Sequence, residues 1–335
     1  MTSLTQEPDI SIAVAGEALV DLIPRPDGSY LPCMGGAPYN LARALARQGV
    51  GTVYLNPLSA DRFGRALAHQ LHQDGVRLAH TAPVAQTTSL AVVGLNGSGH
   101  PDYAFYRDGV ADRQVTAVEL GHACELRTGL QIVCTGALAL DPRDVAVYLP
   151  WLCTQRQAGH LVVVDANFRP SAIPDLASYR SHVLATLSQA DVIKVSDEDL
   201  VHLGWSGVDA VDAARALLQN STATLVALTL GASGAWLLTP DGQWHAQEMD
   251  GLSVVDTVGA GDCFLAGLLA ALLDVQGQER TLKTVLNGSS APGYRGLLRH
   301  ALASASLCVQ QQGCTPPSWQ QTVDWASVHP VLSLD

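Results

Sequence analysis

Runs of consecutive apolar residues, each about the length of a β-strand, alternate along this chain with segments of helical periodicity. Two of these runs, 161–164 and 225–228, contain no polar residue. Such runs are typical of strands buried on both faces of a parallel sheet, because a half-exposed strand alternates apolar and polar side chains. The sequence therefore predicts an α/β fold with helices on both faces of a mostly parallel central sheet.

The same periodicities give the ranges of the expected elements. The large sheet is expected to contain the strands 10–15, 53–55, 131–134, 161–165, 191–195, 225–230 and 235–238. The expected helices are 39–48, 63–73, 143–157, 175–188, 208–219, 260–273, 282–286 and 297–310. Two stretches, about 18–34 and 86–108, predict short strands of a small additional sheet, with a hairpin turn at 96–99. We expect residues 1–335 to form one domain, with a loop insertion at 287–293.

Charge and composition exclude several classes of function. The chain carries 19 Lys and Arg against 31 Asp and Glu, a net charge of −12, so we expect no nucleic-acid partner. No apolar stretch is long enough to span a bilayer, and the first residues do not resemble a signal peptide, so we expect no membrane partner. The seven cysteines are scattered without C-x-x-C spacing, which indicates neither a disulfide framework nor a zinc ribbon and fits a cytoplasmic location.

Common nucleotide-binding and hydrolase signatures are missing from the sequence. The only lysines are Lys194 and Lys283, and neither follows a glycine, which excludes the Gly-Lys-Ser/Thr of a P-loop. The motifs of protein kinases, dinucleotide oxidoreductases, α/β-hydrolases and zinc peptidases are also absent. His69 and His72 lie three residues apart on one expected helix, but they lack neighbouring ligands of suitable spacing and are expected on a solvated face.

The segment 256–262, with the sequence DTVGAGD, runs directly into an apolar helical stretch. Gly259, Ala260 and Gly261 let backbone amides converge, and the following helix adds its N-terminal dipole, so the segment predicts an anion-binding site. A carboxylate beside an anion is unfavourable unless it has a chemical role. Asp262 can take the proton of a hydroxyl that attacks a bound phosphoryl group. Its alternative role is that of a helix cap.

The DTVGAGD segment resembles the second signature of the ribokinase-like, or PfkB, carbohydrate kinases. Further segments match landmarks of that family in the family's order: 16–21 the first strand, 35–40 the substrate element and 229–235 the nucleotide-binding turn. Within the family, 105–112 and 165–170 are similar to the bacterial fructokinase and 2-keto-3-deoxygluconate kinase branch. The resemblance covers nearly the whole chain. It implies a ribokinase-like three-layer sandwich with a small β-sheet lid, formed by the stretches 18–34 and 86–108.

The resemblance also implies roles for individual residues. The implied catalytic group is Asp262 as general base, with the amides of Gly259, Ala260 and Gly261 as the anion hole. The implied sugar-binding residues are Asp21, Gly35, Gly36, Asn40, Arg107, Asn167 and Arg169. The implied nucleotide-binding residues are Ser196, Thr229, Gly231 and Gly234. Carboxylate and amide groups suit a polyol, because they accept and donate several hydrogen bonds to hydroxyls.

The cofactors implied by the resemblance are ATP, Mg²⁺ and K⁺. The family's Asn-x-x-Glu element, which positions Mg²⁺ through water, corresponds here to 196–199, so the role falls to Asp199 or to the neighbouring Glu198. Asp256 resembles the family's ligand for a monovalent cation. A Lys-Gly-Ala segment of many fructokinases is replaced by 311–314, which leaves the adenine pocket undefined.

We therefore expect an ATP-dependent fructokinase that converts D-fructose to fructose 6-phosphate. One alternative is a 2-keto-3-deoxygluconate kinase, in which Arg107 and Arg169 would clamp the substrate carboxylate. The other is a catalytically silent sugar-binding regulatory protein on the same fold. A small sheet with one face on the site leaves an apolar face exposed, so we also expect a homodimer that pairs through the lid.

Overall fold

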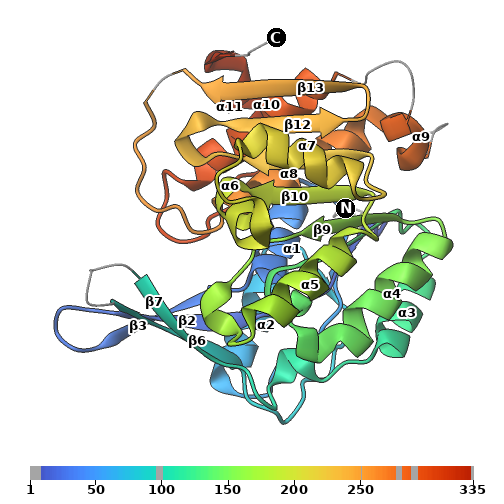
Figure 1. Ribbon diagram of the computed structural model, residues 1–335. Helices are drawn as coiled ribbons and strands as arrows, with labels where there is room; N and C mark the ends of the chain where they lie inside the picture. The colour runs from blue at the N-terminus through green and yellow to red at the C-terminus, as the bar shows by residue number, and fades with distance from the viewer. Residues whose placement is uncertain (1–8, 96–100, 250, 277–280, 288–292, 333–335) are drawn as a thin grey trace, which may run out of the picture.

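The structure is a computed structural model that describes residues 9–95, 101–249, 251–276, 281–287 and 293–332. The strands of its large sheet are β1 (Ile12–Val14), β4 (Thr52–Tyr54), β5 (Arg77–Leu78), β8 (Ile132–Gly136), β9 (Leu161–Asp165), β10 (Val192–Ser196), β11 (Leu225–Thr229), β12 (Ala235–Thr239), β13 (Gly242–Glu248) and β14 (Val331–Leu332). They lie in the order β14-β13-β12-β11-β10-β9-β8-β1-β4-β5 (Figure 1). The strands from β5 to β11 pair in parallel and the remaining three pair antiparallel, which confirms a mostly parallel sheet.

Both faces of this sheet are buried, as the unbroken apolar runs predict. Leu161 and Val163 of β9 pack into the hydrophobic core on one face, and Val162 and Val164 pack into the core on the other. All four side chains are almost fully buried. A strand without polar residues is therefore needed here, because either face of the strand meets an apolar layer.

Helices form the two outer layers of the sandwich (Figure 1). The core on one face includes side chains of α1 (Ala37–Arg47), α2 (Arg62–Gln73), α8 (Ala260–Gln276), α9 (Leu282–Asn287) and α10 (Tyr294–Cys308), and α11 (Trp319–Val328) packs against α10. The core on the other face includes side chains of α3 (Ala117–Glu125), α4 (Val145–Gln157), α5 (Leu176–Leu187), α6 (Asp197–Leu200) and α7 (Ala210–Gln219). No helix in the described ranges is long and apolar enough to cross a membrane.

The small sheet also forms. Its strands are β2 (Leu19–Pro24), β3 (Tyr30–Gly35), β6 (Ser89–Leu95) and β7 (Pro101–Tyr106), in the order β3-β2-β6-β7. The central pair, β2 and β6, is parallel, and the outer pairs are antiparallel. In Figure 1 this sheet projects from the lower left of the molecule. Leu19 and Ala91 attach it to the body by packing with Leu138. The expected turn at 96–99 lies outside the described residues.

Several elements differ from the expectation. The helices α3 and α11 and the strand β13 were not expected, nor were the two-residue strands β5 and β14. The helix expected from Leu297 begins at Tyr294, and residues 288–292 of the expected loop insertion lie outside the described residues. Single turns of 3₁₀ helix occupy Ala111–Arg113, Ala137–Leu140, Pro142–Asp144, Pro170–Ala172 and Gly231–Ser233, and Val201–Trp205 forms a π-helical turn.

The helix α8 is buried around most of its circumference and packs closely against α10. Gly267 of α8 lies at this contact, where an added Cβ atom would be 2.9 Å from the Ser304 Cβ and 3.1 Å from the Ala301 Cα. Real Cβ atoms are almost never that close to their neighbours, so a larger residue would force the two helices apart. The absence of a side chain at Gly267 therefore sets the separation of α8 and α10.

We predict that Gly267→Ala lowers the free energy of unfolding by about 1–3 kcal/mol, the usual cost of overpacking, although alanine favours helix. The matched control is Gly121→Ala in α3, where an added Cβ meets no atom within 4 Å. That change should raise stability by about 0.5–1 kcal/mol through helix propensity alone. Chemical denaturation of the two variants measures both values. Equal stabilisation by both substitutions would contradict close packing at Gly267.

Candidate active site

Asp262 lies in the first turn of α8 and is only 7% exposed. Its Oδ2 accepts a hydrogen bond of 3.0 Å from Nδ2 of Asn40, which is also buried and belongs to α1. The turn before α8 contains Gly259 with φ of +80°, a conformation that favours glycine. The structure therefore brings the DTVGAGD segment and the 35–40 segment together at one point.

Lys194 is a site residue that the sequence analysis did not identify. It is buried in β10, and its Nζ lies 3.1 Å from Oδ1 of Asp165 at the end of the neighbouring strand β9. A Cβ atom at Gly261 would be 3.0 Å from the same Nζ. Burial lowers the pKa of Lys194, but the charges of Asp165, Asp199 and Asp262 outweigh this and raise it. A protonated ammonium group therefore lies directly against the first turn of α8.

Burial raises the pKa of Asp262 to about 7. The charge of Asp165 acts in the same direction, and attraction to Lys194 and the hydrogen bond from Asn40 act against it. Burial also raises the pKa of Asp165 itself, to about 6. A carboxylate with a pKa near 7 can accept and release a proton close to neutral pH, which is the property that a general base needs.

A small hollow opens beside these groups, at the carboxyl ends of β8 and β9. Its lining consists of Ala37, Pro38, Leu41, Thr135, Gly136, Asp165 and Asp262. Two buried polar atoms have no hydrogen-bond partner among the described residues: Oγ1 of Thr135, which lines the hollow, and Oδ1 of Asn40, whose amide nitrogen donates to Asp262 of the lining. Buried polar atoms normally have a partner, so these two indicate that a ligand or water binds in the hollow. Strand ends of this kind are the usual ligand site of open α/β sheets.

Asp21 and the two glycines of the 35–40 segment lie where the small sheet meets the body. Asp21 of β2 faces Gly35 of β3, where an added Cβ would be 2.5 Å from the Asp21 Oδ2. Gly36 has φ of +107°, and a Cβ there would be 2.6 Å from the carbonyl oxygen of Glu17. Burial raises the pKa of Asp21 to about 6, against the attraction of Arg169. Glycine is therefore required at position 36, and at position 35 a side chain would displace the Asp21 carboxylate.

Glu17 is a second buried carboxyl group to which the sequence analysis gave no role. Its Oε1 accepts the amide of Ala37 at 3.1 Å, and its Oε2 has no hydrogen-bond partner among the described residues. Burial raises the pKa of Glu17 to about 7. The first strand segment thus contributes a carboxyl group that holds the start of α1, next to Gly36.

Asn167 and Arg169 lie in the loop that follows Asp165, the last residue of β9. Asn167 has φ of +32°, and asparagine is one of the few residues that adopt positive φ readily. Arg169 is exposed, and its charge lowers the pKa of Asp21, Asp165 and Asp262. The structure therefore brings Arg169 close to the carboxyl groups of both the small sheet and the body.

The expected nucleotide-binding residues gather at the neighbouring strand ends. Ser196 of β10 and Thr229 of β11 are register partners. The turn after β11 contains Gly231 and Gly234, with φ of +54° and +84°. A Cβ at Gly234 would lie 2.1 Å from the carbonyl oxygen of Ala246, so only glycine fits there. The four residues lie along one edge of the sheet, at the ends of β10 and β11 and in the turn after β11.

The sequence matches the description "pfkB family carbohydrate kinase" over residues 9–321. The chain belongs to the PfkB family. It is similar to a fructokinase of Rhizobium leguminosarum bv. trifolii, with 34% identity over 265 residues that cover 78% of this chain and 79% of the relative.

Two solved PfkB kinases have similar folds. One is the ATP-bound fructokinase of Xylella fastidiosa, with 27% identity and a TM-score of 0.80 over 95% of this chain and 98% of that chain. The other is a double mutant of the Vibrio cholerae fructokinase in a fructose-, ADP- and potassium-bound form, with 25% identity and a TM-score of 0.75 over 96% and 99% of the two chains. The shared fold confirms the ribokinase-like architecture.

Three carboxylates were expected near a metal ion in this PfkB chain, and their surroundings differ. Asp199 is buried, and its two oxygens accept the amides of Phe168 at 2.7 Å and Ser196 at 2.8 Å. Glu198 beside it is exposed. Asp256 accepts the amides of Val258 at 3.0 Å and Gly313 at 2.9 Å, and so connects the turn before α8 to the loop after α10.

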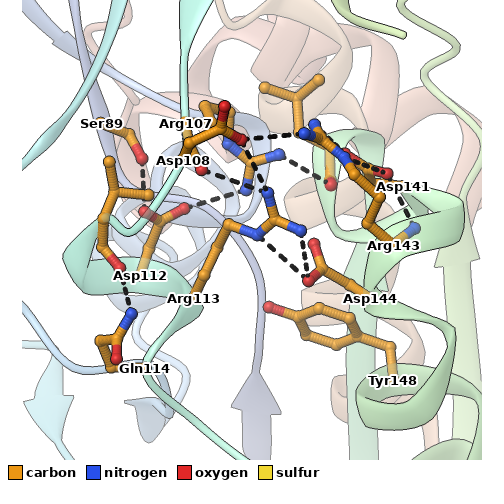
Figure 2. A network of polar contacts seen from close by, with 12 residues as sticks. Ser89, Arg107, Asp108, Asp112, Arg113, Gln114, Asp141, Arg143, Asp144 and Tyr148 are labelled. Atoms are coloured by element: carbon orange, nitrogen blue, oxygen red, sulfur yellow. Dashed lines mark hydrogen bonds and ion pairs between the residues drawn. The ribbon is translucent and has the colours of Figure 1, made fainter.

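Arg107 is buried in a network of ion pairs between the small sheet and the body of the PfkB fold (Figure 2). One guanidinium nitrogen lies 3.0 Å from Asp112, and another donates to the carbonyl oxygen of Leu138 at 3.0 Å. The hydroxyl of Ser89 donates to the other oxygen of Asp112. Nε of Arg107 has no partner among the described residues. Both terminal nitrogens of the Arg107 guanidinium group therefore have partners within the protein.

Proposed function

We propose that this PfkB kinase is an ATP-dependent fructokinase, which converts D-fructose and ATP to fructose 6-phosphate and ADP. The observation that carries the proposal is the buried carboxylate of Asp262, which has a pKa of about 7, lies at the start of α8 and is held by Asn40. The fructokinase names of the similar proteins support fructose as the acceptor.

In the proposed mechanism, Asp262 takes the proton from the 6-hydroxyl of fructose as that oxygen attacks the terminal phosphorus of ATP. The amides of Gly259 and Gly261 donate to the phosphoryl oxygens and stabilise their charge, whereas the amide of Ala260, which the sequence also suggested, donates to the carbonyl oxygen of Thr257 at 3.2 Å. The transition state is loose, so the hydroxyl becomes acidic only as the new bond forms. Asp262 is the third residue of α8, which places it inside the first turn rather than at the capping position before the helix.

The sugar is held in this proposal by groups from three segments. Asp21 and Asn40 bind hydroxyls with carboxylate and amide groups, Gly35 and Gly36 allow a close approach, and Asn167 and Arg169 complete the site. A keto acid would need a second cation to clamp its carboxylate. Arg107 was the expected partner of Arg169, but its pairing with Asp112 favours fructose over 2-keto-3-deoxygluconate.

ATP lies, in this proposal, along the edge formed by Ser196, Thr229, Gly231 and Gly234. Mg²⁺ bound with ATP would neutralise the charge of the transferred phosphoryl group. The exposed carboxylate of Glu198 suits this ion through water, whereas Asp199 uses its oxygens to hold two backbone amides. Asp256 organises the loop that would supply carbonyl oxygens to K⁺.

We also propose a cytoplasmic location and a small-molecule sugar as the binding partner. All seven cysteines lie within the described residues as free thiols, which fits a reducing compartment. The net charge of −12 disfavours nucleic acid as a partner.

Fructose should give the highest kcat/KM among fructose, 2-keto-3-deoxygluconate, ribose and glucose, with ATP as donor. ADP release in a coupled assay measures this for each sugar. A tenfold or greater preference for the keto acid, equal to about 1.4 kcal/mol of transition-state binding, would overturn the fructokinase proposal. A protein that folds and binds a sugar without any ADP release would instead support the regulatory alternative.

Asp262→Asn should lower kcat for fructose phosphorylation by about 10²–10⁴-fold, the usual contribution of a positioned base. Asparagine keeps the size and the hydrogen-bonding reach of the side chain, so thermal stability should change little. Steady-state kinetics and thermal unfolding of the variant measure the two effects. If more than about a tenth of the wild-type kcat remained, a barrier change below about 1.4 kcal/mol, Asp262 would not be the base.

The pH profile provides a second readout of the same role. Asp262 must be ionised to act as base, so kcat/KM of the wild type should fall as the pH drops below about 7, where the carboxyl group becomes protonated. The residual activity of Asp262→Asn should lack this decrease. An unchanged profile in the variant would assign the ionisation to another group.

We propose that the small sheet also forms the interface of a homodimer. Leu22, Tyr30, Val92 and Tyr106 lie on the face opposite Asp21, because alternate residues of a strand point to opposite faces. Tyr30 is 50% exposed and Tyr106 is 61% exposed. An exposed apolar face of this kind is usually covered by a partner, and a second copy presents the same apolar face.

Sedimentation at micromolar protein concentration should therefore show a dimer. Tyr106→Lys should weaken it at least about tenfold, since the change removes apolar area and adds a charge. Val328→Lys is the matched control, because Val328 is 70% exposed on α11, outside the small sheet. A wild-type monomer, or equal weakening by both variants, would contradict an interface at the small sheet.

A further inference from the structure

Three cysteines that are far apart in the sequence meet beside the turn that precedes α8. Cys263 lies in the first turn of α8, Cys308 ends α10, and Cys314 lies in the loop that follows. Their sulfur atoms all lie within 4.8 Å of one another, and the three side chains are buried. The proposed phosphoryl transfer uses none of these thiols, so the cluster needs another explanation.

The spacing of the sulfur atoms suits a metal ion. Thiolates bind Zn²⁺ at about 2.3 Å, so three of them around one ion lie about 4 Å apart. The cluster needs to contract by less than an ångström to reach this distance. A disulfide would use only two of the three sulfurs and would require them to approach to about 2.05 Å. Three sulfur ligands without a histidine select a soft cation rather than Mg²⁺ or Ca²⁺.

The thiols of the cluster can supply the negative charge that a cation needs. A bound cation would displace the three thiol protons to solvent and be held by three thiolates. Water or the carbonyl oxygen of Val258, 3.7 Å from the Cys308 sulfur, can supply a fourth ligand.

The cluster is reachable from solvent on one side and touches the anion hole on the other. Cys314 is 9% exposed, and Gln311, Gln312 and Thr315 around it are exposed. On the inner side, a Cβ atom at Gly259 would lie 2.4 Å from the Cys314 sulfur. If the Cys314 sulfur moved toward a bound ion, its packing against Gly259 would change, and the turn at Gly259 would shift.

We propose that Cys263, Cys308 and Cys314 form a binding site for a soft divalent cation such as Zn²⁺, and that its occupancy inhibits the kinase by shifting the turn at Gly259. The site is distinct from the Mg²⁺ and K⁺ positions of the proposed function, and metal binding does not depend on which sugar is phosphorylated.

The test is a titration of the full-length, metal-free, reduced protein with Cd²⁺, followed through the ultraviolet charge-transfer absorption of cadmium–thiolate bonds. We expect one Cd²⁺ per chain. Cys308→Ala and Cys314→Ala should each weaken binding at least about 100-fold, because each removes a direct ligand. Cys124→Ala is the matched control, since it removes a buried thiol outside the cluster and should bind as the wild type does. Competition with Zn²⁺ should abolish the signal.

A second measurement needs no substituted protein. Alkylation of the wild type followed by peptide mass spectrometry should show that Cd²⁺ protects Cys314 but leaves the half-buried Cys33 and Cys153 as reactive as before. The inhibition part is tested with Zn²⁺ at one equivalent, which should lower kcat in the wild type at least about tenfold and leave Cys308→Ala unaffected. Absence of the thiolate signal, equal loss in Cys124→Ala, or alkylation that Cd²⁺ does not change would overturn the site. Binding without any decrease in kcat would overturn the inhibition.

Discussion

The ammonium group of Lys194 is the charge on which the candidate site depends. It pairs with Asp165 at 3.1 Å and attracts Asp262, so two buried carboxylates share one cation. Without it the carboxylates would repel each other in a region of low polarity, and breaking a buried ion pair typically costs about 3–5 kcal/mol. The parallel pairing of β9 and β10 places Lys194 opposite Asp165. The strand order that builds the sheet therefore also brings the charged groups of the site together.

The fold was predictable where local pattern and tertiary environment agree. The apolar runs at β9 and β11 identified the large sheet, because a strand buried on both faces rarely accommodates polar residues without a buried partner. The helices α3 and α11 were missed because each buries only a narrow face. Both carry a capping box, Thr116 with Glu119 and Ser318 with Gln321, and this signal could have identified them. The register of β13 depends on β12 and is not encoded locally.

The site was predictable only as separate pieces. The DTVGAGD pattern located Asp262, but its contact with Asn40 joins residues 222 positions apart, which no local pattern encodes. Lys194 is set in a short strand without a glycine before it, so its sequence context resembles no known phosphate-binding motif. The sequence also could not show that Arg107 is paired with Asp112, or that three scattered cysteines meet. These facts follow from the arrangement of elements rather than from spacing along the chain.

The large sheet ends on both sides with a strand of two residues, β5 at one edge and β14 at the other. Short edges protect a sheet against pairing with foreign strands, because they offer few free amide and carbonyl groups. Among the described residues, β14 pairs with Gln247 and Glu248 of β13, so displacement of residues 331–332 would lengthen the open edge to all seven residues of β13. The docking of β14 therefore matters more for keeping partly folded molecules apart than for the strength of the core. Substitutions near residue 331 that displace β14 should cause aggregation of a protein whose core is otherwise intact.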